Sequence, residues 1–216
     1  MIDANGTYRT MVGSQEKHLP LVTLSPQLTI ALLISVDHGV EFSTVAGREL
    51  AELLAPYDVD VVVSVATMGI PLAIEVSRAL GLDDYVILQK TPKIHLADAI
   101  AEPVKSITTG APQRLLFDRA RVAAVAGRRV GVVDDVISTG ASLSAALKLL
   151  RSVEAQPVAI GTMLTEASQW RHALGDDARL VHSLGAIPLF RPNPAGELEE
   201  DWDGADPEPV QATTGV

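Results

Sequence analysis

Two adjacent acids, followed by a short loop that carries hydroxyl groups and a glycine, are the residues of this chain best suited to chemistry. Asp134 and Asp135 end an apolar run, and residues 138–142, Ser-Thr-Gly-Ala-Ser, come shortly after them. Gly140 permits close backbone approach, and the first amides of a following helix lack partners within it, so this loop can bind a phosphate group. The ionised carboxylates only accept hydrogen bonds and therefore suit sugar hydroxyls, directly or through a hydrated divalent cation. The pattern predicts a site for a ribose 5-phosphate.

A strand, a turn and a helix must hold these residues in place. The apolar residues from Arg129 onward predict a buried strand, and the segment after the loop has an apolar stripe that predicts an amphipathic helix: Leu143, Ala146, Leu147 and Leu150. Ligands of parallel α/β sheets bind beyond the carboxyl ends of the strands, where the acids and the loop would lie. The alternative is an ordinary strand with an Asp-rich turn and a capped helix.

Residues 132–142, Val-Val-Asp-Asp-Val-Ile-Ser-Thr-Gly-Ala-Ser, closely resemble the phosphoribosyl-pyrophosphate (PRPP) binding motif of type I phosphoribosyltransferases. The resemblance implies an α/β fold in which helices flank a five-stranded parallel sheet and terminal segments form a small hood that selects the base. It also implies Mg²⁺, bound by Asp134 and Asp135, through water. The residues that it assigns to PRPP are Asp134, Asp135, Val136, Ile137, Ser138, Thr139, Gly140, Ala141 and Ser142.

Two further segments supply candidates for binding pyrophosphate. An earlier apolar strand is followed by Thr67, Met68 and Gly69 and then by a helical pattern. In the resembled family, the backbone of this loop holds the pyrophosphate of PRPP, although adenine-type members often carry arginine where this chain has Met68. Lys90 and Lys93 follow the next expected strand and look like the basic pair of purine phosphoribosyltransferases. Plain turn chemistry and two solvated lysines are the alternatives.

Residues 94–117 lack a periodic pattern and are rich in turn-forming and polar residues. Long loops without secondary structure are uncommon in compact domains and often act as lids. The family has a loop here that closes over PRPP, which makes Lys105 a candidate catalytic residue in contact with the leaving group. The alternative is a two-stranded hairpin without a catalytic residue. The proton-transfer group stays open between Glu75, Glu102 and Glu166.

We expect three segments along the chain. Residues 1–54 would form an N-terminal hood segment and a helix, residues 55–190 the phosphoribosyltransferase core, and residues 191–216 an acidic, flexible tail. Residues 27–36 fit either a buried strand or a helix, because a short apolar run does not decide between them. A helix is expected from Ser43 or Thr44, either of which can cap it.

Three aromatic residues have alternative interpretations. Trp170 and Phe190 fit either stacking on a base or packing in the core, and Trp202 could dock the tail.

The composition limits the classes of protein to which this chain could belong. A chain of 216 residues, 47% of them hydrophobic, can bury one substantial core. The formal net charge of -10 argues against a general nucleic-acid binder, and the absence of cysteine excludes disulfides, a thiolate nucleophile and a Cys zinc site. The early apolar run at residues 28–36 is too short to span a bilayer, and no signal-peptide pattern precedes it. We therefore expect a cytoplasmic protein that binds neither nucleic acid nor membrane.

The resemblance implies an enzyme that transfers a 5-phosphoribosyl group from Mg-PRPP to a free purine base, with adenine first, and releases pyrophosphate in purine salvage. Asp134, Asp135 and Lys105 would be its catalytic residues, and a homodimer is expected because family members are commonly dimers. Other bases stay open: hypoxanthine, guanine, xanthine and orotate. So does a PRPP-binding regulatory protein, although the first 45 residues contain no clear helix-turn-helix.

Overall fold

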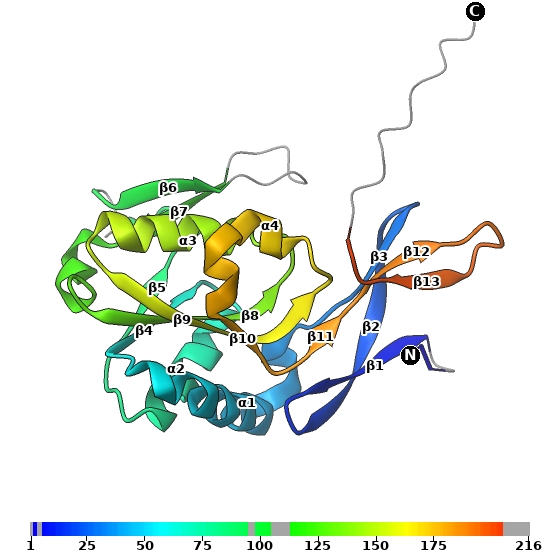
Figure 1. Ribbon diagram of the computed structural model, residues 1–216, viewed down its shortest axis with the longest axis horizontal. Helices are drawn as coiled ribbons and strands as arrows, with labels where there is room; N and C mark the ends of the chain where they lie inside the picture. The colour runs from blue at the N-terminus through cyan, green and yellow to red at the C-terminus, as the bar shows by residue number, and fades with distance from the viewer. Residues whose placement is uncertain (1, 4–5, 95–97, 105–112, 205–216) are drawn as a thin grey trace, which may run out of the picture.

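The computed structural model describes residues 2–3, 6–94, 98–104 and 113–204 of the chain. A parallel sheet with helices on both faces forms the larger part, and a smaller antiparallel sheet lies beside it (Figure 1). A single two-stranded hairpin lies over one face of the larger part. None of the helices in these ranges is long and apolar enough to cross a membrane.

The parallel sheet has the strand order β10-β9-β8-β4-β5, and β11 continues the β10 edge by also pairing with β9. All of its strand pairs are parallel. Its strands are β4 (Val61–Val65), β5 (Tyr85–Leu88), β8 (Arg129–Ile137), β9 (Gln156–Glu166), β10 (Val181–Ser183) and β11 (Ala186–Ile187). The predicted α/β class with a parallel core is confirmed.

Four α-helices cover this sheet: α1 (Gly39–Leu54), α2 (Gly69–Ala79), α3 (Ala141–Ser152) and α4 (Trp170–Leu174). Figure 1 shows α1 and α2 on one face and α3 and α4 on the other. Alternate residues of β4 therefore belong to different cores: Val63 lies in the buried cluster that includes Leu147 of α3, whereas Val62 lies in the cluster that includes Leu50 of α1. Both faces of a central strand are buried in this way, which explains its continuous run of apolar residues.

Short 3₁₀ segments complete the connections: η1 (Ser35–His38), η2 (Ala55–Tyr57), η4 (Arg119–Ala124) and η5 (Gly175–Leu180). Because η1 leads directly into α1, that helix begins at Gly39 and not at Ser43 or Thr44 as predicted. The Ser43 hydroxyl donates a hydrogen bond back to the Gly39 carbonyl at 3.5 Å, so Ser43 lies within the helix and does not cap it.

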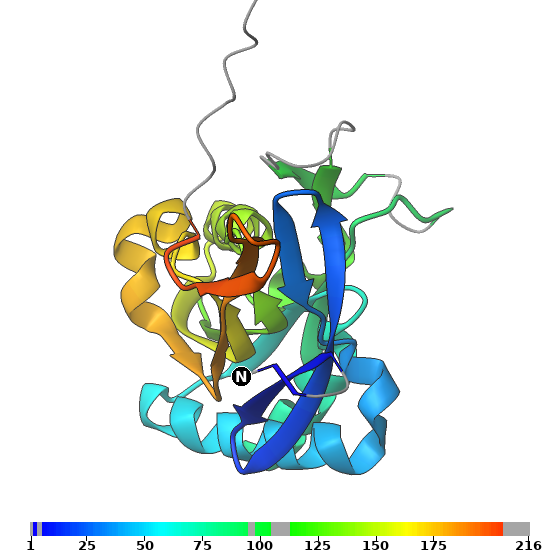
Figure 2. The same ribbon diagram turned by 90° about the vertical axis from the view of Figure 1, so that its right-hand side faces the viewer.

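The antiparallel sheet combines both ends of the described chain in the order β1-β2-β3-β12-β13. Its strands are β1 (Thr7–Val12), β2 (Gln15–Ser25), β3 (Leu28–Ala31), β12 (Leu189–Pro192) and β13 (Leu198–Asp201). Figure 2 shows the blue N-terminal strands beside the orange and red C-terminal strands. This sheet is called the hood below, and its origin from terminal segments confirms the prediction. The open choice for residues 27–36 is decided in favour of a strand at its start.

The acidic segment after Pro192 differs from the flexible tail that was expected from residue 191. Residues 198–201 form β13, which pairs with β12, and Arg191 Nε donates to Asp201 Oδ2 at 2.6 Å. Strand pairing therefore outweighs the disorder-prone composition up to Gly204, while residues 205–216 lie outside the described ranges. The Trp202 side chain is 45% exposed and does not dock this segment in the core.

Residues 100–104 and 113–117 form the two strands of the hairpin that was the alternative to a loop without secondary structure. Strands β6 (Ile100–Val104) and β7 (Gln113–Phe117) pair antiparallel. Leu115 and Phe117 on β7 are fully buried, which fixes the hairpin on the core that α3 covers. Residues 105–112, and with them the candidate Lys105, lie outside the described part of the chain.

Candidate active site

A cavity of about 190 Å³ lies at the carboxyl ends of β4, β5 and β8. Nine of its lining residues are the predicted PRPP set, residues 134–142, and Thr67, Met68 and Lys90 line it as well. Gly69 starts α2 beside it, and Lys93 does not line it. The structure thus brings three segments of the sequence prediction to one place, as expected for strands of one parallel sheet.

The loop after β8 is shaped for close approach of a ligand. Gly140 has φ 76°, a conformation in which a side chain is disfavoured, and α3 begins at the next residue. The Ala141 amide donates to Thr139 Oγ1 at 3.3 Å. A Cβ atom on Gly140 would come within 3.1 Å of the Trp170 carbonyl oxygen, so α4 supports the loop from behind. The amides that follow Ala141 in the first turn of α3 remain available to an anion, and the helix dipole favours negative charge there.

The two acids, Asp134 and Asp135, lie within β8, which continues to Ile137, and they interact with each other. The Asp135 amide donates a hydrogen bond to Asp134 Oδ1 at 3.1 Å. Burial, followed by the neighbouring charge of Asp135, raises the pKa of Asp134 well above its usual value, while Lys90 acts in the opposite direction. The pair therefore resists carrying two negative charges until hydroxyl donors or a cation reach it.

The loop after β4 packs directly against these acids. The peptide bond between Ala66 and Thr67 is cis. A Cβ atom on Gly69 would lie 2.1 Å from Ser64 Oγ and 3.1 Å from Asp134 Oδ1, so only glycine fits there. The Ser35 hydroxyl donates to the Met68 carbonyl oxygen at 3.1 Å, which ties the loop to η1. Neither Ser35 nor Ser64 was marked by the sequence pattern, because both act across segments.

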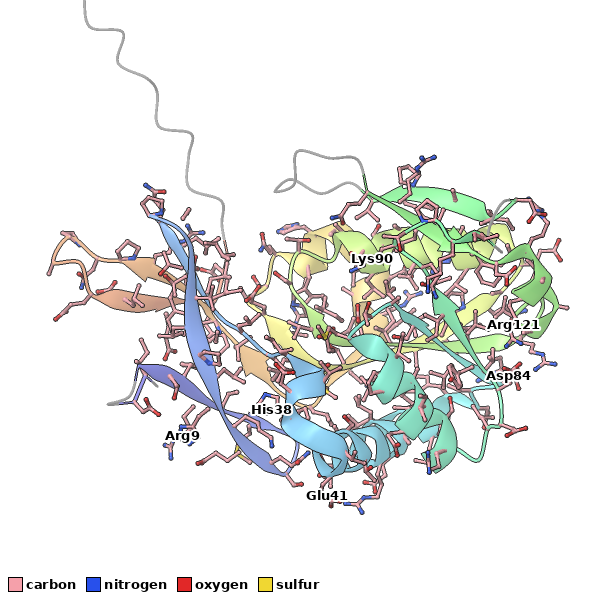
Figure 3. All side chains as sticks on the ribbon, turned by 180° about the vertical axis from the view of Figure 1, so that it is seen from behind. Arg9, His38, Glu41, Asp84, Lys90 and Arg121 are labelled. Carbon is pink, nitrogen blue, oxygen red and sulfur yellow. The ribbon has the colours of Figure 1, made fainter. Side chains whose placement is uncertain are left out.

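The two predicted lysines are placed differently. Lys90 follows β5 and lines the cavity, whereas Lys93 is exposed on the loop beyond it. Figure 3 shows Lys90 well separated from Asp84, which precedes β5 and pairs with Arg121 at 2.5 Å. The structure places Lys90, and not Lys93, at the cavity, and a role in anion binding stays a prediction for both.

A second, larger cavity of about 560 Å³ lies between the hood and the parallel sheet. Its walls are mostly apolar and include Leu28 and Ile30 of the hood and Leu189 of β12. Trp170 and Phe190 are buried in the core and do not line it. The two cavities adjoin, because they share Met68, Asp135, Val136, Ser138 and Thr139.

Glu166 is the glutamate that the structure places at this junction. It is the last residue of β9, is 5% exposed and lines the larger cavity. The Ser138 hydroxyl donates a hydrogen bond to its carboxyl group, and burial raises the pKa of Glu166. Glu75 and Glu102, the other two candidates from the sequence, line neither cavity. A glutamate at the carboxyl end of a predicted parallel strand was the signal that could have distinguished it.

The donor set fits a magnesium ion that arrives with its substrate. Within the described ranges, no three or more His, Asp or Glu residues are grouped to hold a metal ion. Mg²⁺ usually keeps several waters and binds through one or two carboxylates together with substrate phosphates. The adjacent carboxyl groups of Asp134 and Asp135 supply such a set.

A parallel sheet with two acids in one strand, a glycine-containing loop between that strand and the next helix, and a hood beside them define the class of type I phosphoribosyltransferases. A family model described as a phosphoribosyl transferase domain matches residues 44–186, and the chain belongs to this family. The family and enzyme class predicted from the motif are confirmed.

Individual relatives differ in their named activities. The chain is 27% identical over 157 residues to a xanthine phosphoribosyltransferase of Brevibacillus brevis, covering 72% of this chain and 79% of the relative. It is 28% identical over 144 residues to the purine biosynthesis transcriptional repressor PurR of Bacillus subtilis, covering 66% of this chain and 49% of the repressor. A crystal structure of adenine phosphoribosyltransferase from Rhodothermus marinus has the same fold, with a TM-score of 0.60 and 20% identity over 78% of this chain and 94% of that one.

Proposed function

We propose that this protein transfers a 5-phosphoribosyl group from Mg-PRPP to a purine base, with adenine as the first candidate, and releases pyrophosphate. The observation that carries this proposal is the junction of the two cavities. The smaller cavity has hydrogen-bond donors for an anion and acceptors for sugar hydroxyls. The larger cavity is mostly apolar and large enough for a planar base. PRPP in the smaller cavity and a base in the larger cavity would meet at Asp135 and Ser138.

Each part of the smaller cavity has a role in this reaction. Asp134 and Asp135 bind the ribose hydroxyls and, through water, the Mg²⁺ that accompanies PRPP. Residues 138–142 bind the 5-phosphate. The backbone at residues 67–69 and the Lys90 ammonium group bind the pyrophosphate, and Lys93 and Lys105 are further candidates for that contact.

The reaction needs no covalent nucleophile on the protein. The bond from ribose C1 to the pyrophosphate oxygen breaks, a bond from C1 to a base nitrogen forms, and the proton of that nitrogen leaves. Pyrophosphate departs with the bonding electrons, so positive charge develops on the sugar and negative charge on the leaving group. Catalysis then consists mainly of positioning and of electrostatic stabilisation of pyrophosphate by the backbone at residues 67–69, which leads into the N-terminus of α2, and by Lys90.

A double substitution tests these roles. Asp134→Asn with Asp135→Asn should leave the protein folded but abolish pyrophosphate release, because loss of one preorganised charged group costs on the order of 10²-fold to 10³-fold in rate. Asp83→Asn with Asp84→Asn is a matched control, since these adjacent acids precede β5, at the end of the sheet away from the cavity. Undiminished pyrophosphate release by the first variant would refute the assignment.

A panel of bases tests the acceptor. Adenine, hypoxanthine, guanine, xanthine and orotate are each incubated with the protein, Mg²⁺ and PRPP, and the nucleotide product is identified by mass. Adenosine monophosphate as the main product is the expected result. A larger yield of the xanthine or orotate nucleotide would contradict the adenine assignment while leaving the transfer reaction intact.

A PRPP-binding regulator is the second candidate, because the chain resembles about half of a purine repressor. Such a protein would bind Mg-PRPP in calorimetry but form no nucleotide with any base of the panel. A gel shift on purine-operon DNA, with and without PRPP, would then separate it from an enzyme. Homodimer formation and a cytoplasmic location are further expectations, to be checked by light scattering and by cell fractionation.

A further inference from the structure

Few of the described residues that line the larger cavity are charged, and more of them are acidic than basic. Among the described residues that line it, Asp135, Glu166 and Arg191 carry ionisable groups. Arg191 is paired with Asp201, whose carboxyl oxygen lies 2.6 Å from its Nε atom. The cavity therefore contains carboxyl groups and a cation whose charge is already balanced.

Glu166 has the geometry of a ligand-binding group. Its Oε2 atom accepts the hydrogen bond from Ser138, while Oε1 accepts no bond from any residue that the structure describes. The side chain borders an apolar cavity at a residue exposure of only 5%. A polar atom in such surroundings costs free energy unless something bonds to it, so a ligand with matching groups gains from meeting it.

We propose that Glu166 binds the base directly and selects an uncharged heterocycle that presents a hydrogen-bond donor beside an acceptor, and that the cavity rejects anionic bases. This inference rests on the proposed function and names the acceptor class within it. A protonated carboxyl group offers one donor and one acceptor side by side, which pair with an amidine or amide edge of a purine. Oε2 retains a lone pair for the base after accepting from Ser138.

We expect the larger cavity to reject anionic bases because of their negative charge. Orotate carries a permanent carboxylate, which would lie near Asp135 in poorly solvated surroundings. Like charges repel strongly where water is excluded, and the Arg191 cation is already engaged by Asp201. An uncharged purine meets no such penalty.

Calorimetry on the full chain tests the inference without requiring turnover. At a pH at which the Glu166 carboxyl group is protonated, wild-type protein should bind adenine at least about 100-fold more tightly than orotate, because a buried unpaired charge costs several kcal/mol. Glu166→Met keeps the length of the side chain but removes both hydrogen-bonding groups, and should weaken adenine binding about 10-fold to 100-fold. Glu166→Gln keeps one donor and one acceptor, and should stay within about threefold of wild type. Glu75→Met and Glu75→Gln are matched controls, since Glu75 lines neither cavity.

The outcomes separate this inference from the proposed function. Equal affinity for orotate and adenine, or unchanged adenine affinity in Glu166→Met, overturns it, and so does the absence of binding by any free base. Loss of Mg-PRPP binding with adenine binding retained counts against the proposed function alone.

A second measurement keeps the inference testable if Glu166→Met does not fold. Because the protonated carboxyl is the binding form, wild-type affinity for adenine should fall as pH rises through the raised pKa of Glu166. Glu166→Gln should lack that fall, while Asp135 and the Arg191–Asp201 pair, the other charged groups facing the cavity, are unchanged between the two proteins. Identical pH profiles would overturn the inference.

Discussion

Gly69 and Asp134 approach so closely that a Cβ atom on Gly69 would lie 3.1 Å from the Oδ1 atom of Asp134. The same Cβ atom would lie 2.1 Å from Ser64 Oγ, which is buried without a hydrogen-bond partner among the described residues. This contact joins the loop after β4, assigned to pyrophosphate, to an acid within β8, assigned to ribose. The proposed pyrophosphate and ribose sites can therefore pack together in this way only because residue 69 is a glycine.

Gly69→Ala should destabilise the protein by about 1 to 3 kcal/mol, because an added methyl group overpacks the site, and should weaken Mg-PRPP binding by displacing the loop. Removing the hydroxyl that the methyl group meets, in Gly69→Ala with Ser64→Ala, should recover part of the lost stability. Chemical denaturation measures the first effect and calorimetry the second. An unchanged stability of Gly69→Ala would show that the loop moves at no cost, and no recovery in the double variant would show that the Ser64 hydroxyl is not the obstacle.

Asp134→Asn should stabilise the protein at neutral pH while removing a ribose contact. The pKa of Asp134 is raised by burial and by Asp135, so the folded protein binds that proton more tightly than the unfolded chain does. Ionisation therefore lowers stability as pH rises from the unfolded value, about pH 4, through the raised pKa.

The unfolding temperature of Asp134→Asn should exceed that of wild type by a few degrees at neutral pH, and the difference should vanish below about pH 4. Melting curves without Mg²⁺ over this range measure it, and Asp83→Asn serves as an exposed control. A lower unfolding temperature for Asp134→Asn at neutral pH would contradict the argument.

Gly140→Ala should lower the stability of the protein more than substitution of a glycine that has no neighbouring atoms. Gly81 has φ 73° and no atom within 4 Å of an added Cβ, so Gly81→Ala reports only the backbone strain, about 1 to 2 kcal/mol. Gly140→Ala adds contact with the Ala173 side chain and the Trp170 carbonyl at 3.1 Å. We expect a larger loss of stability for Gly140→Ala and at least tenfold weaker Mg-PRPP binding, a figure set by about one charge-assisted hydrogen bond. Equal losses of stability and of Mg-PRPP affinity in Gly140→Ala and Gly81→Ala would contradict a special role for the loop after β8.

Lys90→Met should weaken pyrophosphate and PRPP binding about 10-fold to 100-fold, as expected for one charge-assisted contact in a partly enclosed site. Lys93→Met should have a smaller effect, because Lys93 does not line the cavity. Both substitutions remove one positive charge from an exposed position, so their comparison cancels the change in net charge. Competition by pyrophosphate at two salt concentrations measures the difference. A larger effect at Lys93 would reverse the assignment.

The sequence by itself determined the parts of this protein that depend on neighbouring residues. The run from Val132 to Ser142 specifies a strand, two acids and an anion-binding turn within a few residues, so its place at a strand end could be predicted. The parallel core followed from the alternation of apolar strands and helices, since short right-handed crossovers permit few other arrangements.

Only the tertiary structure decided the contacts between distant segments. β13 pairs with β12, so an acidic composition that predicted a flexible tail instead forms a hood strand. Ser138 meets Glu166 because β8 and β9 lie side by side, a contact that the residues around Glu166 do not predict. The cavity under the hood likewise requires β3 from one end of the chain to pair with β12 from the other. Local propensity fixes a strand or a turn, whereas these contacts depend on which surfaces the whole chain can bury together.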